Sequence, residues 1–322
     1  MPKGKPPYAG GCTLTKKSNR DPDEQVDWRG STAFLLVHLA GLCAPLTGIS
    51  WPALFMCVLM YVFRMFAITG GYHRYFSHRS YKTSRWFQFL LAFVGASAGQ
   101  KGPLWWAAHH RHHHKSSDHM DDIHSPLRRG FWWAHIGWVL CKKYLPTREE
   151  KVKDLARYRE LKWLNRHHEV APFLLAVSLF GFGEFLKVQA PTLNTSGLQM
   201  LAWGFFASTT LLYHGTFFIN SLAHLVGYQR FETNDGSKNS FILAVITLGE
   251  GWHNNHHRFP GVERQGIRWW EIDMTHYLLK LLSWAGLVWD LRPHPMEALV
   301  ASSRQAPTVP KSAQVRLISS QQ

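Results

Sequence analysis

Closely spaced histidines are the residues of this chain best suited to chemistry. Twenty histidines occur among the 322 residues, and five of them stand in the run HHRHHHK at 109–115. A metal site of the form His-x-x-His-His can be taken from this run in two ways, which spacing alone leaves open. The two alternatives are His109, His112, His113 and His110, His113, His114.

Two further clusters accompany this run. His253, His256 and His257 repeat the pattern, and on a helix such a triplet projects from one face and can direct three imidazoles to one metal ion or two adjacent ones. Imidazole is a neutral ligand that suits iron, zinc or copper. His73 and His78 form a third pair, but five residues of α-helix rotate by about 140°. We therefore expect the helix to end between them.

The isolated histidines call for a different interpretation. A histidine in apolar or aromatic surroundings is more often a hydrogen-bonded packing residue than a ligand. His167 and His168 follow a basic amphipathic stretch, so we expect them at lipid headgroups or in solvent. The residues with an expected packing role are His38, His135, His214, His276 and His294.

Apolar windows predict the elements that must position these clusters. Four windows are each about as long as a bilayer-spanning helix requires, which predicts an all-α integral membrane protein with four transmembrane helices. About thirty polar residues precede the first window, so it is poorly placed to be a cleaved signal peptide. The windows are 31–49, 52–71, 172–188 and 198–219.

The distribution of charge predicts the orientation. The formal net charge is +15, and nearly all basic residues lie in 1–30, 72–171 and 220–322. By the positive-inside rule these segments and both termini face the cytosol. This excess of positive charge follows the membrane topology, which argues against a nucleic-acid binder. All three histidine clusters fall in the predicted cytosolic cap, 72–171 and 220–295, whereas 296–322 reads as a weakly ordered tail.

Cysteine offers no alternative chemistry. Of the four cysteines, Cys43 and Cys57 fall inside predicted spans, and no Cys-x-x-Cys pattern occurs. The sequence therefore predicts neither a disulfide framework nor a thiolate zinc site.

Four motifs make the chain resemble the membrane fatty acyl desaturases of the stearoyl-CoA (delta-9) type, with a motif style closest to bacterial members. The resemblance runs from about the second span to Pro260 and predicts one membrane desaturase domain, 31–295. The motifs are HRYFSH (73–78), HRHHHK (110–115), NSLAH (220–224) and GEGWHNNHHRFP (249–260).

The resemblance implies a metal site. The family motif His-Arg-x-His-His-Lys selects the alternative that begins at His110, and Asn220 corresponds to a residue that reaches the metal through water. Two iron ions (Fe²⁺) are the implied cofactors, and zinc can replace them in recombinant protein. The implied ligands are His73, His78, His110, His113, His114, His224, His253, His256 and His257.

The resemblance also implies a reaction. Members introduce a cis double bond, usually at carbon nine, into a saturated acyl-CoA with dioxygen and two electrons. The chain lacks a Gly-x-Gly-x-x-Gly dinucleotide motif and a His-Pro-Gly-Gly haem motif, so a separate donor is implied: cytochrome b5, a ferredoxin or a flavoprotein reductase. The bacterial inner membrane is the expected location, or the endoplasmic reticulum in a eukaryote.

A narrow apolar tunnel must present one bond of the acyl chain to the metals, because its methylenes are chemically alike. Trp106 is the tunnel residue that the resemblance favours. The other aromatic residues available to line it are Trp105, Trp132, Trp133, Trp203, Phe205 and Phe206.

The polar head of the substrate is expected to meet basic residues. Lys142 and Lys143 match a basic pair that contacts coenzyme A in animal relatives, but Lys101, Ala108 and His109 depart from the neighbouring polar positions. A lipid-bound acyl substrate therefore remains an alternative.

Three further expectations complete the sequence-based interpretation. Arg64 interrupts the second span and is expected to extend its guanidinium to the membrane interface. A histidine-box membrane hydroxylase is an alternative enzyme. A metal transporter or sensor is the alternative that is not an enzyme.

Overall fold

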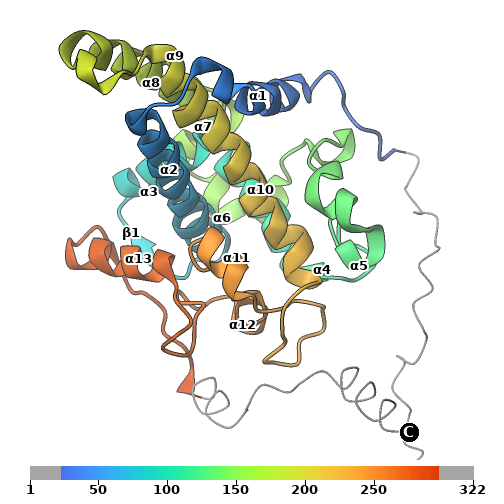
Figure 1. Ribbon diagram of the computed structural model, residues 1–322. Helices are drawn as coiled ribbons and strands as arrows, with labels where there is room; N and C mark the ends of the chain where they lie inside the picture. Colours follow the sequence, from blue (N-terminus) through green and yellow to red (C-terminus); the bar gives the residue numbers. More distant parts are fainter. Residues whose placement is uncertain (1–22, 297–322) are drawn as a thin grey trace, which may run out of the picture.

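The computed structural model describes residues 23–296, which form a helical molecule with one small sheet (Figure 1). The sheet pairs β1 (Lys82–Thr83) antiparallel with β2 (Val288–Trp289). The helical prediction is confirmed. The predicted tail lies outside the described residues apart from Met296, and the predicted N-terminal segment is described only from Asp23.

Two helices are long and apolar enough to cross a membrane, judged by length and composition within 23–296. One is α2 (Trp51–Phe66), which continues into a π-helix, Ala67–Ser77; the other is α8 (Val170–Gln189). The Ser50 hydroxyl caps α2 by accepting from the Ala53 N–H, and Pro52 occupies its first turn.

The other two predicted spans have a different form. α1 (Thr32–Leu42) has only 11 residues and is followed by a 3₁₀ turn, Ala44–Thr47. The fourth window lies in a continuous helical run that is long but does not reach the apolar composition of the two candidate spans. This run consists of α9 (Gly197–Gln199), a π-helix (Met200–Ala207) and α10 (Ser208–Ser221).

The remaining elements belong to the segments of the predicted cap; among them α11, α12 and α13 lie at the end of the molecule opposite α8 and α9 (Figure 1). The helices of the cap are α3 (Arg85–Ala96), α4 (Pro103–Ser116), α5 (Pro126–Arg129), α6 (Lys153–Ala156), α7 (Arg159–Arg166), α11 (Phe241–Ile246), α12 (His253–Arg258) and α13 (Met274–Trp284). It also contains a short π-helix, Trp133–Gly137, and three 3₁₀ turns, Lys142–Tyr144, Glu149–Lys151 and Leu222–His224. Outside these segments, a further 3₁₀ turn, Pro191–Leu193, follows α8.

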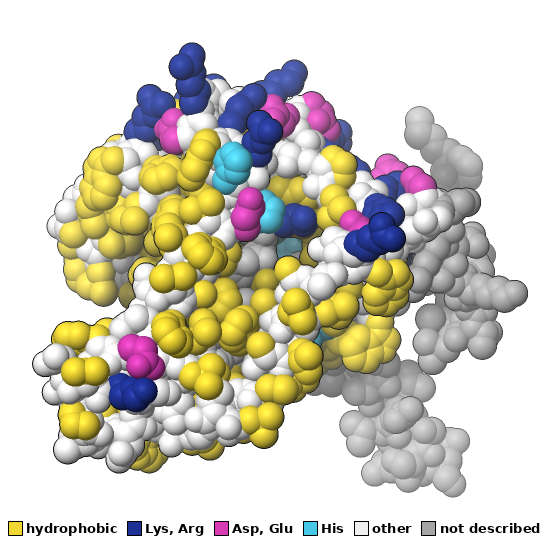
Figure 2. Space-filling view, turned by 90° about the horizontal axis from the view of Figure 1, so that it is seen from above, with side chains coloured by type: hydrophobic (Ala, Val, Ile, Leu, Met, Phe, Trp, Pro, Cys, Tyr) yellow, Lys and Arg dark blue, Asp and Glu magenta, His cyan; other side chains and the backbone are white. Residues whose placement is uncertain are grey.

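The apolar surface follows the candidate spans. Large hydrophobic side chains of α1, α2 and α8 are exposed, and Figure 2 shows hydrophobic side chains over much of the face seen from above. Such a continuous apolar surface is unusual for a soluble monomer and suits contact with lipid.

The helix ends at Ser77, between His73 and His78 as expected, but the two rings still share a face, which was not expected. It continues as a π-helix to Ser77, and the His78 N–H donates to the His73 carbonyl oxygen at 3.2 Å. A π-helix closes its hydrogen bonds over five residues, so this spacing is one turn and both rings lie on one face. The rings are 4.8 Å apart between centroids.

Arg64 does not extend toward the interface, so that expectation was wrong. Its side chain is fully buried, and its guanidinium donates to the Ser97 carbonyl oxygen, Thr209 Oγ1 and Ser208 Oγ. Ser97 is the C-cap of α3, where the helix dipole presents negative charge. Arg64 therefore joins α2, α3 and α10.

Candidate metal centre and substrate cavity

The structure brings nine histidines into two adjacent groups, each with its ligand atoms within 4.8 Å of one another. Neighbouring Nε2 atoms lie 2.8 Å apart in His78 and His110, and 3.0 Å apart in His224 and His253. The five-histidine group contains His73, His78, His110, His114 and His256. The four-histidine group contains His113, His224, His253 and His257.

Four separate segments supply these side chains. The end of the π-helix supplies two, α4 three, the 3₁₀ turn at Leu222–His224 one, and α12 three. Within α4, His109 and His112 point elsewhere. His109 Nδ1 donates to the Trp105 carbonyl oxygen, and His112 Nε2 pairs with the Asp121 carbonyl oxygen. Neither residue belongs to the two groups.

Carboxylates lie behind four of the nine imidazoles. Each accepts from the Nδ1–H, which leaves the Nε2 lone pair directed toward the other histidines of its group. One such pair is in the five-histidine group and three are in the other. The pairs are His73 with Glu250 (2.5 Å), His113 with Asp122 (3.1 Å), His224 with Asp118 (2.8 Å) and His257 with Asp235 (2.6 Å).

The sequence interpretation missed these carboxylates. Asp118 and Asp122 follow the second motif closely, and Glu250 stands three residues before His253. That proximity was the available signal. Asp235 lies in a loop, and no feature of the sequence pointed to it.

Burial sets the charge state of the site. It lowers the pKa values of His78, His110, His114, His253 and His256 well below the ordinary value, so these imidazoles are neutral. Burial also opposes ionisation of Asp118, but the hydrogen bond and charge of His224 outweigh it and lower the pKa of that carboxyl to about 2.

The donor set fits metal ions. Several imidazole nitrogens converge in each group, and the buried Nε2 of His257 has no hydrogen-bond partner in the described structure. Neutral nitrogen donors held by carboxylates are typical ligands of iron and zinc. The two groups can therefore each hold one metal ion.

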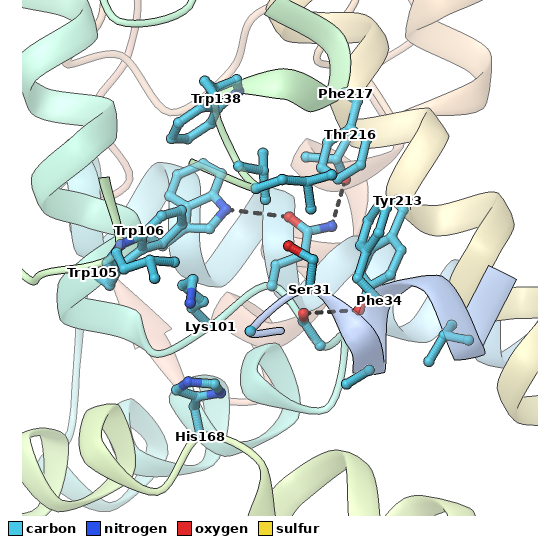
Figure 3. Close-up of a pocket in the computed structure, with 18 of the residues that line it drawn as sticks. Ser31, Phe34, Lys101, Trp105, Trp106, Trp138, His168, Tyr213, Thr216 and Phe217 are labelled. Carbon is cyan, nitrogen blue, oxygen red and sulfur yellow. Dashed lines mark hydrogen bonds between the residues drawn. The ribbon is translucent and has the colours of Figure 1, made fainter. Parts of the chain in front are cut away.

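A cavity of about 280 Å³ leads to His110. We call it the outer cavity; its wall includes the start of α1, the start of α8 and α10 (Figure 3). An inner cavity of about 40 Å³ lies beyond it and reaches Met65 and His73. Both cavities are lined by Trp106, His110, Thr216 and Asn220.

Hydrogen bonds hold the junction of the two cavities. The Trp106 indole N–H donates to Gln100 Oε1 at 3.3 Å, and Gln100 Nε2 donates to Thr216 Oγ1 at 2.9 Å (Figure 3). Spacing gave no signal for Gln100 or Thr216. The hydrogen bonds of Gln100 and Thr216 hold the Trp106 ring beside the His110 ring. The two rings stack, with their centroids 5.0 Å apart.

The predicted substrate contacts lie in different places. Trp105, Trp106 and Phe205 line the outer cavity, as expected of tunnel residues, whereas Trp132, Trp133, Trp203 and Phe206 do not. Lys142 is exposed, and Lys143 forms an ion pair with Asp23 at 3.0 Å. Neither lysine lines the cavity.

The isolated histidines mostly pack as expected. His135 and His214 share a hydrogen bond of 3.0 Å, and His276 pairs with Glu263. His294 departs from the expectation, because both of its ring nitrogens are buried without a partner in the described structure. His168 also departs, since it lines the outer cavity.

Comparisons with known proteins relate the chain to fatty acid desaturases. The fatty acid desaturase family model matches residues 49–290. The chain is 36% identical to an acyl-CoA 5-desaturase of Anemone leveillei, over 82% of this chain and 81% of that protein. It is 34% identical to an sn-2 palmitoyl-lipid 9-desaturase of Nostoc, over 83% and 91%. It is 37% identical to a delta-9 acyl-lipid desaturase of Arabidopsis thaliana, over 81% of each chain.

Proposed function

Because this chain belongs to the fatty acid desaturase family and is a fatty acyl desaturase, we propose that it introduces a cis double bond at the delta-9 position of a saturated acyl-CoA. One molecule of dioxygen, two electrons and two protons are consumed with each pair of hydrogens removed, and two waters form. The observation that carries the proposal is the junction of the two cavities, which lies directly beside His110.

The nine grouped histidines would hold two iron ions, with Asn220 contributing through water. Bound iron would supply the reduction of dioxygen and the removal of hydrogen from an unactivated chain, which no side chain can perform. Support comes from the converging imidazole nitrogens and from the carboxylates behind them. Loading with zinc is compatible with the same donors.

The side chains of the protein then position the acyl chain of the substrate. The apolar walls exclude water from the acyl chain. The hydrogen-bonded Gln100, Trp106 and Thr216 hold the junction rigid, so that one carbon pair lies beside His110 when the chain extends into the inner cavity. Met65 closes the inner cavity against the methyl end.

The membrane arrangement is part of the proposal. We infer four spans, α2, α8, α1 with its following turn, and the helical run Gly197–Ser221, with the cap and both termini in the cytosol. The exposed leucines of α1 support this inference. A separate donor of the cytochrome b5, ferredoxin or flavoprotein type would then reach the basic cap from the cytosol.

A lipid-bound acyl substrate is the second candidate. The outer cavity is lined by Ser31 before α1 and by Glu169 before α8, a candidate membrane span. An opening there would admit a chain from the bilayer, and two of the relatives above are named for lipid-bound substrates.

Product analysis tests both candidates. Purified iron-loaded protein is incubated with stearoyl-CoA, or with stearoyl-phosphatidylcholine vesicles, together with dioxygen, a reductant and a carrier. Mass spectrometry should find oleate from stearoyl-CoA. Oleate from the vesicles alone would select the lipid substrate, and a hydroxy acid as the main product would overturn the desaturase proposal.

A His256→Ala variant distinguishes the desaturase proposal from metal transport. The variant should lose desaturation in cells while metal uptake stays unchanged, because His256 lies in the five-histidine group. The opposite pattern would favour a transporter or sensor.

A further inference from the structure

A basic helix leads directly into one of the candidate membrane spans. α7 ends at Arg166, and only residues 167–169 separate it from Val170, where α8 begins. Three residues of chain reach at most about 10 Å. α7 must therefore lie close to the depth at which α8 would enter a bilayer. None of its side chains lines either cavity, so the substrate path does not account for it.

The exposed face of α7 combines positive charge with an aromatic ring. Four exposed side chains follow the spacing i, i+3, i+4 and i+7, which places them on one side of the helix. On the other side, Leu161 and Leu164 are fully buried, so the helix cannot turn its exposed face inward. The four exposed residues are Arg159, Lys162, Trp163 and Arg166.

Two of the three cations on this face are free to bind a ligand. Arg159 and Arg166 form no ion pair within residues 23–296, whereas Lys162 pairs with Glu149 at 3.0 Å. The acidic residue of α7, Glu160, lies off this face and is held in an ion pair of 2.6 Å with an arginine of α3. Each free guanidinium has five N–H donors. The face therefore offers unused donors together with net positive charge.

The molecule presents cations toward the bilayer at the edge of the cap. Figure 2 shows the molecule from the end that carries α8 and α9, and Lys and Arg side chains gather along one edge of that view. Basic side chains visible from this end face the headgroups of the leaflet that the proposed spans enter. Hydrophobic side chains cover much of the same view, as expected where the spans meet lipid.

We propose that the exposed face of α7 binds the phosphate groups of anionic phospholipids in the cytosolic leaflet. The inference rests on the membrane arrangement within the proposed function and adds a lipid-binding surface to it. Arginine binds phosphate through paired N–H donors, and tryptophan is enriched at the membrane interface. Trp163 and the direct connection to α8 favour a lipid surface over an acidic protein.

This contact also positions part of the outer cavity. His168 and Glu169 connect α7 to α8, and both line that cavity. When α7 is held at the headgroups, this part of the cavity wall lies at the surface of the bilayer. Anionic lipid therefore holds the cavity wall next to the membrane.

A double variant, Arg159→Gln with Arg166→Gln, tests the proposal. The purified protein in maltoside detergent is titrated with dioctanoyl-phosphatidylglycerol, and with dioctanoyl-phosphatidylcholine as the zwitterionic reference. Each basic residue near an anionic lipid surface contributes about a factor of five to binding. The variant should therefore bind phosphatidylglycerol roughly 20-fold more weakly, with unchanged binding of phosphatidylcholine. Iron content and melting temperature should stay at wild-type values, because both side chains are exposed.

A matched control removes the same charge elsewhere. Lys280 on α13 and Arg292 after β2 are also exposed. Lys280→Gln with Arg292→Gln should bind phosphatidylglycerol like the wild type. Equal losses in the two double variants would mean that net charge alone attracts the lipid, and wild-type affinity in the α7 variant would mean that α7 does not bind it. Either result would overturn the proposal.

Desaturation assays in the same detergent identify other ligands of this face. The α7 variant should keep the wild-type KM for stearoyl-CoA and for an acidic carrier such as cytochrome b5. A raised KM for the carrier with unchanged lipid affinity would assign the face to a protein partner, and a raised KM for stearoyl-CoA would assign it to the coenzyme phosphates; both contradict the proposal. Wild-type protein that binds phosphatidylglycerol through α7 but forms no product would defeat the proposed function and leave this surface standing.

Discussion

His73 Nδ1 and Glu250 Oε2 lie 2.5 Å apart, and both side chains are buried. The same carboxylate accepts from Arg74 and Gln265. Glu250 therefore orients one imidazole of the five-histidine group and balances the Arg74 charge behind it. It is the only carboxylate paired with that group in the described structure.

Glu250→Gln should weaken metal binding at the five-histidine group about 10–100-fold, the usual cost of losing a partner behind a metal-binding histidine. The amide would also set an N–H against Arg74 or Gln265, because all three neighbours of Glu250 are donors. Iron per protein after dialysis against a graded chelator series measures the effect. Glu160→Gln, in an exposed ion pair with Arg85, is the control and should bind iron like the wild type.

The register of the second motif is tested by three alanine variants. His110→Ala should lose iron, because its Nε2 lies 2.8 Å from that of His78 in the five-histidine group. His109→Ala and His112→Ala should retain iron, since their bonded nitrogens face the Trp105 and Asp121 carbonyl oxygens. Elemental analysis of the purified variants measures this directly. Equal loss from all three would mean that the register was misread, and loss from His109→Ala and His112→Ala alone would mean that the other alternative is used.

Local sequence pattern was enough to find the histidines but not the backbone that holds them. His253, His256 and His257 lie on a helix at the predicted spacing. His73 and His78 were assigned to a helix end, because an α-helical rotation was assumed where the chain forms a π-helix. The difference between these helices arises from packing of the whole element, which no short motif encodes.

Contacts between residues far apart in the sequence could not be predicted either. Asp235 meets His257 across 22 residues and Asp118 meets His224 across 106. Hydrophobic windows predicted where apolar helices would lie. They could not predict that α1 would stop at Leu42, because a window average does not register the turn that Pro45 introduces.

Met65 is expected to limit the length of the substrate. It is buried, lines the inner cavity and lies next to Gly215 of α10. Met65→Ala should raise kcat/KM for longer acyl chains roughly tenfold relative to stearoyl-CoA, since each methylene in an apolar pocket discriminates by about that factor. A series of acyl-CoA substrates measures it.

Met65→Ala should lower the free energy of unfolding by about 2 kcal/mol. This is at the low end for truncating a buried methionine, because Met65 already borders a cavity. Met60→Ala, five residues earlier in α2 and outside both cavities, is the control. Unchanged chain-length preference in Met65→Ala would place the end of the acyl chain elsewhere.

Arg64 offers a test of how a buried cation is tolerated without a carboxylate. In Arg64→Met, Ser208 and Thr209 keep partners, because their hydroxyls also donate to the Gly204 and Phe205 carbonyl oxygens. The Ser97 and Met60 carbonyl oxygens each lose a side-chain donor, so the loss of stability should be about 1–3 kcal/mol. Arg64→Lys keeps the charge, but one ammonium cannot span the four acceptors that the guanidinium reaches.

A buried charge with incomplete hydrogen bonds costs more than its absence, so Arg64→Lys should be the less stable variant by about 2 kcal/mol. Thermal unfolding of both variants in the same detergent, followed by tryptophan fluorescence, gives the order. The reverse order would mean that the positive charge itself is required at the C-terminus of α3, where the helix dipole attracts it.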